Sequence, residues 1–384
     1  MNIAARPKPS FFDLRQAVEG AEWNFWEAET DYLTHAIHRY SGKFIPQIAA
    51  QAISMLTREG DVVLDPYCGS GTTLLEAALL KRAAIGSDLN PLAALIARVK
   101  TTPIPTKQLD GLKQLLAEIV AGLDGDLFGE LIDTTVDVRL VDPWYTKWFS
   151  TQNLFDLVRI HRAISKIEEG ALKDVATVAF SDVLRRSSNA HQGYPNVMFD
   201  RRGIFRPRPG RQFLKALNSI CESIASLQDY ATELSSVSVG VADAGDLNIA
   251  DESVDAVITH PPYVGSIPYA EYLALSLKWL GEDPKDLDKK LTGGQRQSRT
   301  VLPRFEQGYR KMLEESFRVL KRGGNMFLMV GNPTIKGVLV DLAEMTTSYC
   351  YEIGFEFVAN TTRSAKNRRS NQMGDEVLLF FSKC

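Results

Sequence analysis

Two stretches of this sequence combine residue types suited to chemistry on a bound ligand. In "DPYCGSGTT" (residues 65–73), Gly69 and Gly71 stand between an apolar run and a segment with helical spacing. Glycines at such a junction let the backbone turn tightly and approach a ligand, and the helix that follows offers unpaired N–H groups. In "HPPY" (residues 260–263), two prolines stand between a histidine and a tyrosine. The two stretches predict a ligand-binding turn and a rigid polar motif.

An acidic residue follows the glycine turn at the spacing typical of nucleoside-binding proteins. Residues 61–67 predict a buried strand, and Asp88 ends the next strand, about 20 residues past the glycines, where a carboxylate accepts hydrogen bonds from ribose hydroxyls. Leu74 stands where a dinucleotide fingerprint needs its third glycine, and the lysine of a P-loop is missing after Gly71. The pattern favours a nucleoside-containing cofactor other than ATP or NAD. A glycine turn that only joins a strand to a helix is the alternative.

Both motifs resemble those of one enzyme group. "DPYCGSGTT" is similar to the signature of S-adenosylmethionine-dependent amino-methyltransferases that act on nucleic acids, and "HPPY" resembles their [D/N/S]PP[Y/F/W] motif. "THAIHRYSGKFIPQI" (34–48) and "NPLAALIARVKTTPI" (90–104) are similar to segments of bacterial DNA methyltransferases of the cytosine-N4 and adenine-N6 type. The likeness covers residues 30–104 and 236–384. It implies a Rossmann-like α/β fold with a mostly parallel seven-stranded sheet and an antiparallel edge pair.

The resemblance also implies where S-adenosylmethionine binds. It places Asp65 and the two glycines around the methionine part, Asp88 on the ribose, and Asp243 at the adenine. "RYSGKF" lacks the proline and alanine usual in the stretch that would bring Phe44 near the methionine part. The cofactor-binding residues that the resemblance implies are Phe44, Asp65, Tyr67, Gly69, Gly71, Thr72, Thr73, Asp88, Leu89, Asp243 and Ala244.

The HPPY motif suits transfer of a methyl group to the exocyclic amine of a base. Such an amine is a weak nucleophile because its lone pair is delocalised into the ring, and acceptors aimed at its N–H bonds stabilise the positive charge that develops during transfer. In the family, the first motif residue and the carbonyl of the first proline are those acceptors, two prolines hold the backbone rigid, and the aromatic residue stacks on a flipped base. The resemblance implies catalytic roles for His260, Pro261, Pro262 and Tyr263.

His260 departs from the family, which has Asp, Asn or Ser at this position. Neutral imidazole keeps one acceptor nitrogen, whereas imidazolium has only donors. We therefore expect activity to fall as the pH drops through the pKa of His260, and a flat profile from about pH 5.5 to 8 would contradict this. The alternative is that His260 marks a protein that binds nucleic acid and has lost catalysis.

Residues 105–235 break the alternation of strands and helices. Residues 107–122, 151–169 and 211–229 carry the apolar spacing of helices, so we expect a mainly helical insertion that recognises the DNA target. Within it, residues 181–215 hold eight Arg and Lys against two Asp, a local charge of +6. The predicted nucleic-acid-binding residues are Arg185, Arg186, Arg201, Arg202, Arg206, Arg208 and, in a second basic run, Arg368 and Arg369. The alternative is a solvated loop whose arginines pair with acids elsewhere in the protein.

Further segments complete the predicted sheet. "VSVGVADAGDLN" (237–248) and "VDAVITHPPY" (254–263) predict two more buried strands, and a helix that stops at Gly323 leads directly into a strand. A helix at 337–353 precedes "FEFVAN" and "EVLLFFSK", a predicted antiparallel pair at the sheet edge. Residues 1–29 are too short for a domain, and we expect Trp23 and Trp26 to cover an apolar surface of the core.

Composition excludes several classes of protein. The apolar and charged fractions, 45% and 24%, are those of a globular protein, and no run approaches the roughly 18 apolar residues of a membrane span. With no secretory signal pattern at the N-terminus, we expect a cytoplasmic location. The four cysteines form no CxxC pair, which predicts reduced thiols rather than disulfides or a zinc site. His35 and His38 are three residues apart without an acidic partner nearby in the sequence, so we expect structural roles and no metal.

The sequence as a whole favours a site-specific DNA methyltransferase. We expect transfer from S-adenosylmethionine to the exocyclic amine of a flipped base, with cytosine N4 favoured because "THPPY" differs by one residue from the TSPPY of many cytosine-N4 enzymes. The expected partners are DNA and a cognate restriction endonuclease or defence-system subunit. Adenine-N6 methylation, tRNA guanosine-N2 methylation, in which the glycine turn also precedes the second motif, and binding without catalysis are the alternatives.

Overall fold

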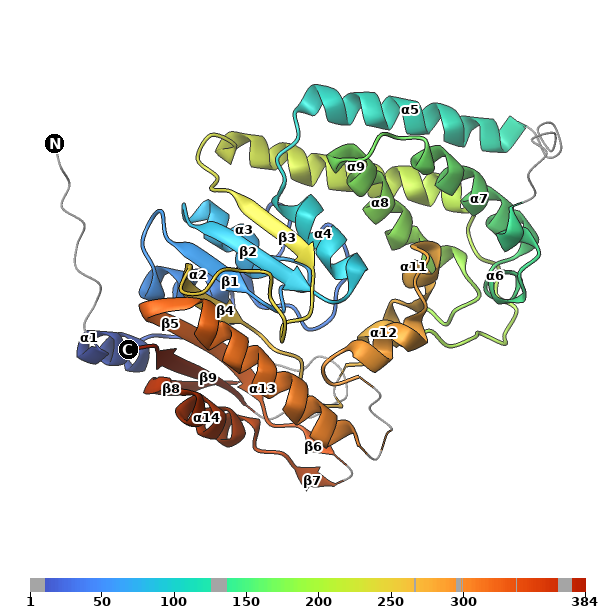
Figure 1. The fold of residues 1–384 in the computed structure, drawn as a ribbon. Helices are drawn as coiled ribbons and strands as arrows, with labels where there is room; N and C mark the ends of the chain where they lie inside the picture. The colour runs from blue at the N-terminus through green and yellow to red at the C-terminus, as the bar shows by residue number, and fades with distance from the viewer. Residues whose placement is uncertain are drawn as a thin grey trace.

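The chain folds around a seven-stranded sheet. The structure is a computed structural model, and it describes residues 11–125, 137–265, 267–294, 298, 300–335, 337–364 and 375–384. The strand order is β3-β2-β1-β4-β5-β9-β8 (Figure 1). The strands are β1 (Val62–Asp65), β2 (Ala83–Asp88), β3 (Val237–Val241), β4 (Val254–Thr259), β5 (Leu320–Gly331), β8 (Glu356–Arg363) and β9 (Glu376–Ser382). A small hairpin, β6 (Thr334–Ile335) and β7 (Val338–Leu339), stands apart from the sheet.

The first five strands of this order run parallel to one another, and β9 runs antiparallel to its neighbours on both sides. β1 pairs in parallel with β2 and β4, β2 with β3, and β4 with β5, whereas β9 is antiparallel to both β5 and β8. This confirms the predicted α/β fold with its antiparallel edge pair. Because parallel strands end at one edge of a sheet, the loops that follow β1, β2, β3 and β4 meet there.

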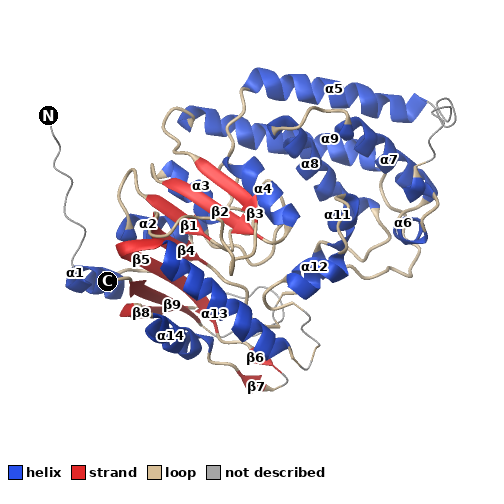
Figure 2. Cartoon of the chain, in the orientation of Figure 1, coloured by secondary structure: helices blue, strands red, loops and turns tan. Residues whose placement is uncertain are grey.

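Helices cover both faces of the sheet (Figure 2). Along the central strands, alternate side chains enter different cores: Val63 and Ala256 pack with α2, while Leu64 and Val257 pack with α13. This period of two reflects the alternation of side chains along a strand. The helices of these layers are α1 (Phe11–Glu19), α2 (Pro46–Leu56), α3 (Thr72–Leu79), α4 (Pro91–Thr101), α13 (Val301–Val319) and α14 (Leu342–Ile353).

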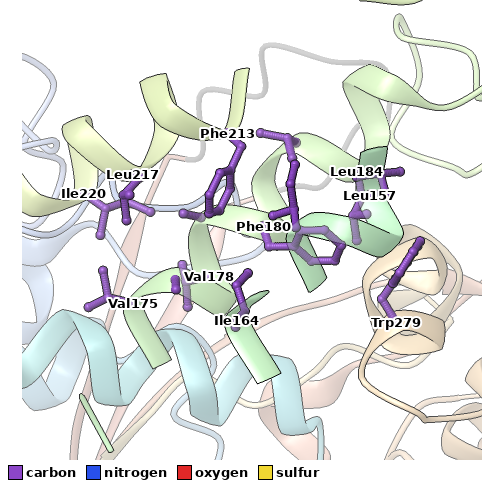
Figure 3. Packing of buried hydrophobic residues seen from close by; sticks show 14 of the residues in the cluster. Leu157, Ile164, Val175, Val178, Phe180, Leu184, Phe213, Leu217, Ile220 and Trp279 are labelled. Carbon is purple, nitrogen blue, oxygen red and sulfur yellow. The ribbon is translucent and has the colours of Figure 1, made fainter. Parts of the chain in front are cut away.

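A helical layer lies beyond β3, next to α4 (Figure 1). It contains α5 (Thr106–Gly125), α6 (Pro143–Trp148), α7 (Thr151–Ser165), α8 (Ala171–Ser187) and α9 (Pro209–Ala225), with short 3₁₀ turns at Val138–Leu140 and Ser226–Tyr230. Its core packs Phe180, Phe213 and Leu217 between α8 and α9 (Figure 3). Three short helices, α10 (Tyr269–Tyr272), α11 (Ala274–Trp279) and α12 (Pro284–Lys290), follow β4.

The predicted helices of residues 105–235 agree with α5, α7 and α9, but the sequence did not reveal α8. This helix contacts α4, α7, α9 and α11, so buried residues occur on several of its sides. A helix buried on several sides has no single apolar stripe for a periodicity search to find. Because α4 contributes side chains to the same core, the extent of a separate inserted domain stays a prediction.

Three other predictions need correction. β3 is largely exposed rather than buried, because it is the edge strand and pairs only with β2 among the described strands. α13 ends at Val319 instead of Gly323, since Leu320 already pairs with Val254 of β4. The helix expected at 337–353 begins at Leu342, after the small hairpin.

Trp23 and Trp26 differ in their surroundings. Trp23 is 2% exposed and its ring lies 5.9 Å from Phe327 and 5.7 Å from Phe380, so it covers the core as predicted. Trp26 is 45% exposed, which contradicts the same prediction for that residue. Among the described helices, none has the length and apolar character needed to cross a membrane.

We predict that Trp23→Ala destabilises the protein by about 3–5 kcal/mol, because it removes a large buried ring and leaves a cavity against β5 and β9. The matched variant Trp26→Ala should cost less than about 1 kcal/mol, since a half-exposed ring loses less burial. Urea unfolding followed by circular dichroism measures both. Equal losses for the two variants would contradict the packing described for Trp23.

Candidate functional site

A pocket lies where the parallel strands end. Its volume is about 800 Å³, including space open to solvent, which is within the range of cofactor sites. It is lined by the loops after β1, β2, β3 and β4 and by a loop that precedes α2. All but one of the predicted cofactor-binding residues line it: Phe44, Asp65, Tyr67, Gly69, Thr72, Thr73, Asp88, Leu89, Asp243 and Ala244.

Gly71 is the exception, and its glycine has a different physical reason. Its φ is +80°, and a Cβ atom there would lie 2.8 Å from the Cβ of Ala97 on α4. Gly71 therefore permits the close packing of α3 against α4, and it is not part of the pocket lining. Gly69, with φ +51°, does line the pocket, and an added Cβ would meet the ring of Tyr40 at 3.3 Å. Only glycine adopts such backbone conformations readily.

Asp65 and Asp88 are two of the three acids that line this pocket; the third is Asp243. Asp88 accepts hydrogen bonds from the amides of Gly69 (3.0 Å) and Asn90 (2.8 Å), and Asp65 accepts one from the hydroxyl of Thr259 (2.6 Å). Burial raises the pKa of both acids to about 6, against the opposing effect of these hydrogen bonds. Asp88 thus holds the turn in place while its carboxylate faces the pocket.

Other polar atoms of the pocket wall lack partners. Thr72 Oγ1 and Asn90 Nδ2 are buried without a hydrogen-bond partner among the described residues, and both residues line the pocket. Burying an unpaired polar atom is costly, so such atoms are typical of a site that a polar ligand completes. One hydroxyl acceptor, one amide donor and two carboxylates fit a ligand with an amino group, a carboxylate and ribose hydroxyls.

His260 lines the same pocket. Its ring stacks on Phe44 at 5.1 Å, and its Nε2 lies 2.7 Å from the hydroxyl of Tyr263. Burial and then the charge of Arg363 lower the pKa of His260 to about 4, with a smaller opposing effect from the backbone of Gly42. The imidazole is therefore neutral at physiological pH, as an acceptor must be.

This pKa corrects the expected pH profile. The sequence predicts a fall in activity near the ordinary pKa of histidine. A pKa of about 4 instead moves the protonation of His260 below the range from about pH 5.5 to 8. A flat contribution from His260 between about pH 5.5 and 8 now agrees with the structure. Burial, which the sequence did not show, is the reason.

The other residues of the HPPY motif do not all line the pocket. Pro262 lines the pocket, whereas Pro261 and Tyr263 are not part of its lining. Tyr263 is 7% exposed and packs beside Gly331, where an added Cβ would lie 2.8 Å from the ring. In this conformation its ring offers no face to a base. The stacked rings of Tyr40 and Tyr269, 5.9 Å apart, line the pocket instead.

The sequence reasoning missed several residues of the pocket. These are Tyr40, Lys43, Asn90, Tyr269, Leu291 and Thr292. Tyr40 and Lys43 lie in "RYSGKF", where the resemblance implies a role only for Phe44. Asn90 comes two residues after Asp88 and is the N-cap of α4. Thr292 is 3.1 Å from the hydroxyl of Tyr67, a contact between segments far apart in the chain. No local signal marks such a contact.

The predicted basic surface is mostly neutralised by its own neighbours. Arg202 and Arg206 pair with Asp200 at 2.9 and 2.7 Å, and Arg208 pairs with buried Asp156 at 2.8 Å. The guanidinium of Arg185 donates to backbone carbonyls of the loop at residues 191–196. These arginines hold the loop together. The pair with Asp156 agrees with the alternative interpretation, which expected acids from elsewhere in the protein, whereas Asp200 belongs to the segment itself.

Two of the predicted arginines are placed differently. The Arg186 side chain is 54% exposed and 3.4 Å from Asp182, and Arg201 is exposed. Arg368 and Arg369 lie outside the described residues. Arg186 lines a groove together with Arg39, Tyr40 and Tyr269, and the two tyrosines also line the pocket. The groove therefore adjoins the pocket.

The remaining histidines and the cysteines have structural surroundings. His35 Nε2 lies 2.8 Å from Glu76 of α3, an acidic partner that the sequence did not reveal, and His38 Nε2 lies 3.1 Å from Ser181. Cys68, Cys221 and Cys350 are buried free thiols, and Cys384 is an exposed one. No cluster of three or more potential metal ligands occurs in the part of the chain that the structure describes.

Comparison with known proteins agrees with the geometry. A family model described as DNA methylase, of the N6/N4 type, matches residues 18–98. The chain is 24% identical over 425 residues to the type II methyltransferase M.MvaI of Kocuria varians, covering 94% of this chain and 91% of the relative. These similarities support an amino-methyltransferase of the N4 or N6 type. They also support S-adenosylmethionine as its cofactor, as the resemblance implied.

Two further similarities are more distant. The type II methyltransferase M.BsoBI of Geobacillus stearothermophilus is 25% identical over 285 residues, which cover 68% of this methyltransferase and 55% of the relative. A TehB-like S-adenosylmethionine-dependent methyltransferase from Corynebacterium glutamicum has 9% sequence identity, covers 88% of this chain and 87% of its own, and has a TM-score of 0.33.

We predict that the affinity of this methyltransferase for S-adenosylmethionine falls as the pH drops from 7 to 5. Below its pKa of about 6, Asp88 carries a proton and loses an acceptor for ribose hydroxyls, so the affinity should fall by up to about tenfold per pH unit. Asp88→Asn should bind weakly at both pH values and show no such slope. Calorimetric titration measures this, and an unchanged slope in Asp88→Asn would assign the effect to Asp65 instead.

Proposed function

We propose that this protein methylates the N4 amine of cytosine within a specific DNA sequence. The observation that supports the proposal is that one pocket joins the glycine turn and Asp88 with His260 and Pro262. A cofactor site and an acceptor for the target amine are thereby neighbours in one cavity. The choice of cytosine N4 over adenine N6 rests on the similarity of "THPPY" to the motif of cytosine-N4 enzymes.

In this proposal the chain's own residues bind and orient the reactants. S-adenosylmethionine supplies the methyl group from its sulfonium centre. Asp88 holds the ribose, Thr72 and Asn90 meet the polar groups of the methionine part, and Asp243 lies at the adenine. Neutral His260 accepts a hydrogen bond from the target amine. These acceptors stabilise the positive charge that develops on the amine in the transition state.

The tyrosine pair offers a place for a flipped base. Tyr40 and Tyr269 are stacked, and both line the pocket and the groove beside it. Stacking on an aromatic ring is worth about 1–3 kcal/mol per base, which offsets part of the cost of extrusion. We therefore assign base stacking to this pair in place of Tyr263.

The groove is suited to the DNA backbone. Arg39 and Arg186 are exposed along it, the Arg185 guanidinium lies behind them, and the facing acid is Asp182. A groove with this excess of cations attracts phosphates. DNA bound there would present a base to Tyr269 at the point where groove and pocket meet.

Methyl transfer with labelled cofactor tests the proposed function. The protein is incubated with DNA of mixed sequence or with tRNA, and the digested nucleosides are identified. N4-methylcytosine is the expected product, N6-methyladenine would correct the target atom, and a methylated guanosine from tRNA would overturn the proposal. Binding of cofactor without any product would indicate a protein that has lost catalysis.

We predict that His260→Ala lowers kcat by about 10²–10³-fold, because it removes an acceptor that acts on the developing charge. The affinity for S-adenosylmethionine should change little. His260→Asn, which restores an oxygen acceptor, should recover part of the activity. Steady-state kinetics measure both variants on unmethylated DNA that contains the site identified by the labelling experiment. Full activity of His260→Ala would contradict the role of the imidazole.

Charge reversal in the groove should weaken DNA binding. Arg186→Glu is predicted to lower the affinity for DNA and to reduce the dependence of binding on salt, because fewer counterions are released. Arg310→Glu is the matched control: Arg310 is a partly exposed arginine on α13, paired with Glu314 and Glu352 outside the groove. Fluorescence anisotropy over a salt series gives both quantities. Equal losses of DNA affinity in the two variants would contradict the groove as the site of DNA binding.

A further inference from the structure

A buried row of polar groups connects the antiparallel edge of the sheet with His260. Arg363 of β8 and Glu376 of β9 are cross-strand neighbours, and Arg363 Nη1 lies 3.0 Å from Glu376 Oε2. The other carboxylate oxygen, Oε1, accepts a hydrogen bond from the hydroxyl of Tyr263 at 3.3 Å. That hydroxyl is 2.7 Å from His260 Nε2. Arg363 and Glu376 are each 6% exposed, and Tyr263 is 7% exposed.

The order of donors along this row determines where His260 carries its hydrogen. A carboxylate only accepts, so the one hydroxyl hydrogen of Tyr263 points to Glu376. The Tyr263 oxygen is then the acceptor for His260, and Nε2 must be the nitrogen that carries hydrogen. A neutral imidazole has a single N–H, so Nδ1 is left with a lone pair.

The surroundings of Nδ1 agree with this order. Nδ1 is buried and has no hydrogen-bond partner among the described residues. Gly42 also lines the pocket, and its backbone favours the protonated form of His260, but no hydrogen bond joins it to Nδ1 in this geometry. An acceptor without a partner in the wall of the pocket is what a base amine requires.

The opposite tautomer would be unfavourable here. With hydrogen on Nδ1, Nε2 would take the hydroxyl hydrogen of Tyr263, and the phenol oxygen would then face Glu376 Oε1 with no hydrogen between them. Two acceptors in contact in a buried site leave both unsatisfied, a cost that water does not relieve. Burial raises the pKa of the Glu376 carboxyl, while the charge of Arg363 and the hydrogen bond from Tyr263 oppose this effect and favour the carboxylate that the preference requires.

We propose that Glu376, paired with Arg363, is a positioning residue that acts through Tyr263 to hold His260 as the tautomer with hydrogen on Nε2, leaving Nδ1 to accept a hydrogen bond from the target amine. This inference rests on the proposed function, since it names how the acceptor of that same site is prepared. It also gives Tyr263 a role other than the base stacking expected from the sequence.

Nitrogen NMR of the imidazole tests the tautomer directly. In the ¹⁵N-labelled protein, the signals of His260 are identified by their loss in His260→Asn, and they report which nitrogen carries hydrogen. We expect hydrogen on Nε2 in the unaltered protein. In Glu376→Gln the amide can donate to the Tyr263 oxygen and free its hydrogen for His260, so hydrogen should move to Nδ1. The kcat should fall about 10–100-fold with little change in KM.

Glu376→Gln leaves the buried charge of Arg363 unpaired, which can prevent folding, so a second variant is needed. Tyr263→Phe keeps the ion pair and removes only the hydroxyl, so both tautomers should be populated and kcat should fall. Glu76→Gln is the spectral control, because Glu76 is a buried acid that contacts a different histidine, His35, at 2.8 Å, together with Tyr32 at 2.6 Å. It should alter the signals of His35 and leave those of His260 unchanged.

The outcomes separate this inference from the proposed function. Hydrogen on Nδ1 in the unaltered protein, or an unchanged tautomer in Tyr263→Phe, would overturn the inference even in an active enzyme. A shifted tautomer with unchanged kcat would also overturn it. The NMR spectra need no turnover, so a protein that methylates no DNA would end the proposed function while the tautomer is still determined.

Discussion

The convergence of parallel strand ends at one sheet edge is the constraint on which this site depends. β1, β2 and β4 are neighbours and run in one direction, so Asp65, Asp88 and His260 are brought together although they come from distant parts of the chain. No loop needs to be long to achieve this. The glycine turn is anchored at the same edge by the bond from the Gly69 amide to Asp88. A shift in the register of β4 against β1 would remove the acceptor from the cofactor site.

Burial then sets the charge of each group at that edge. It raises the pKa of the two pocket acids and lowers that of His260, because a site with little water disfavours every charged form. The acids recover part of their charge through amide and hydroxyl donors. The imidazole lies near the cation of Arg363 instead, which favours its neutral form. The same burial therefore produces carboxylates that titrate near neutrality and a histidine that does not.

The arginine-rich segment shows how composition and surface charge differ. Residues 181–215 carry a charge of +6, yet Arg202, Arg206 and Arg208 are paired with acids that are themselves buried. Those pairs cross-link the loop between α8 and α9. Of the exposed cations of this segment, Arg186 borders the groove next to the tyrosine pair. The position of positive charge relative to the pocket matters more for a nucleic acid than the total charge of the segment.

The sequence by itself determined the order of strands and helices, the glycine turn with Asp88, and the HPPY motif, because these depend on local patterns of apolar spacing and backbone restriction. It did not determine α8, whose several buried sides leave no stripe, or the reason for Gly71, which lies in Ala97 of another helix. Only the tertiary structure brings Tyr269 and Thr292 to the pocket. The row from Arg363 to His260 also forms only in the folded chain, because Glu376 and Tyr263 are more than a hundred positions apart. Such contacts depend on strand pairing, and no local pattern records which distant side chain will lie opposite.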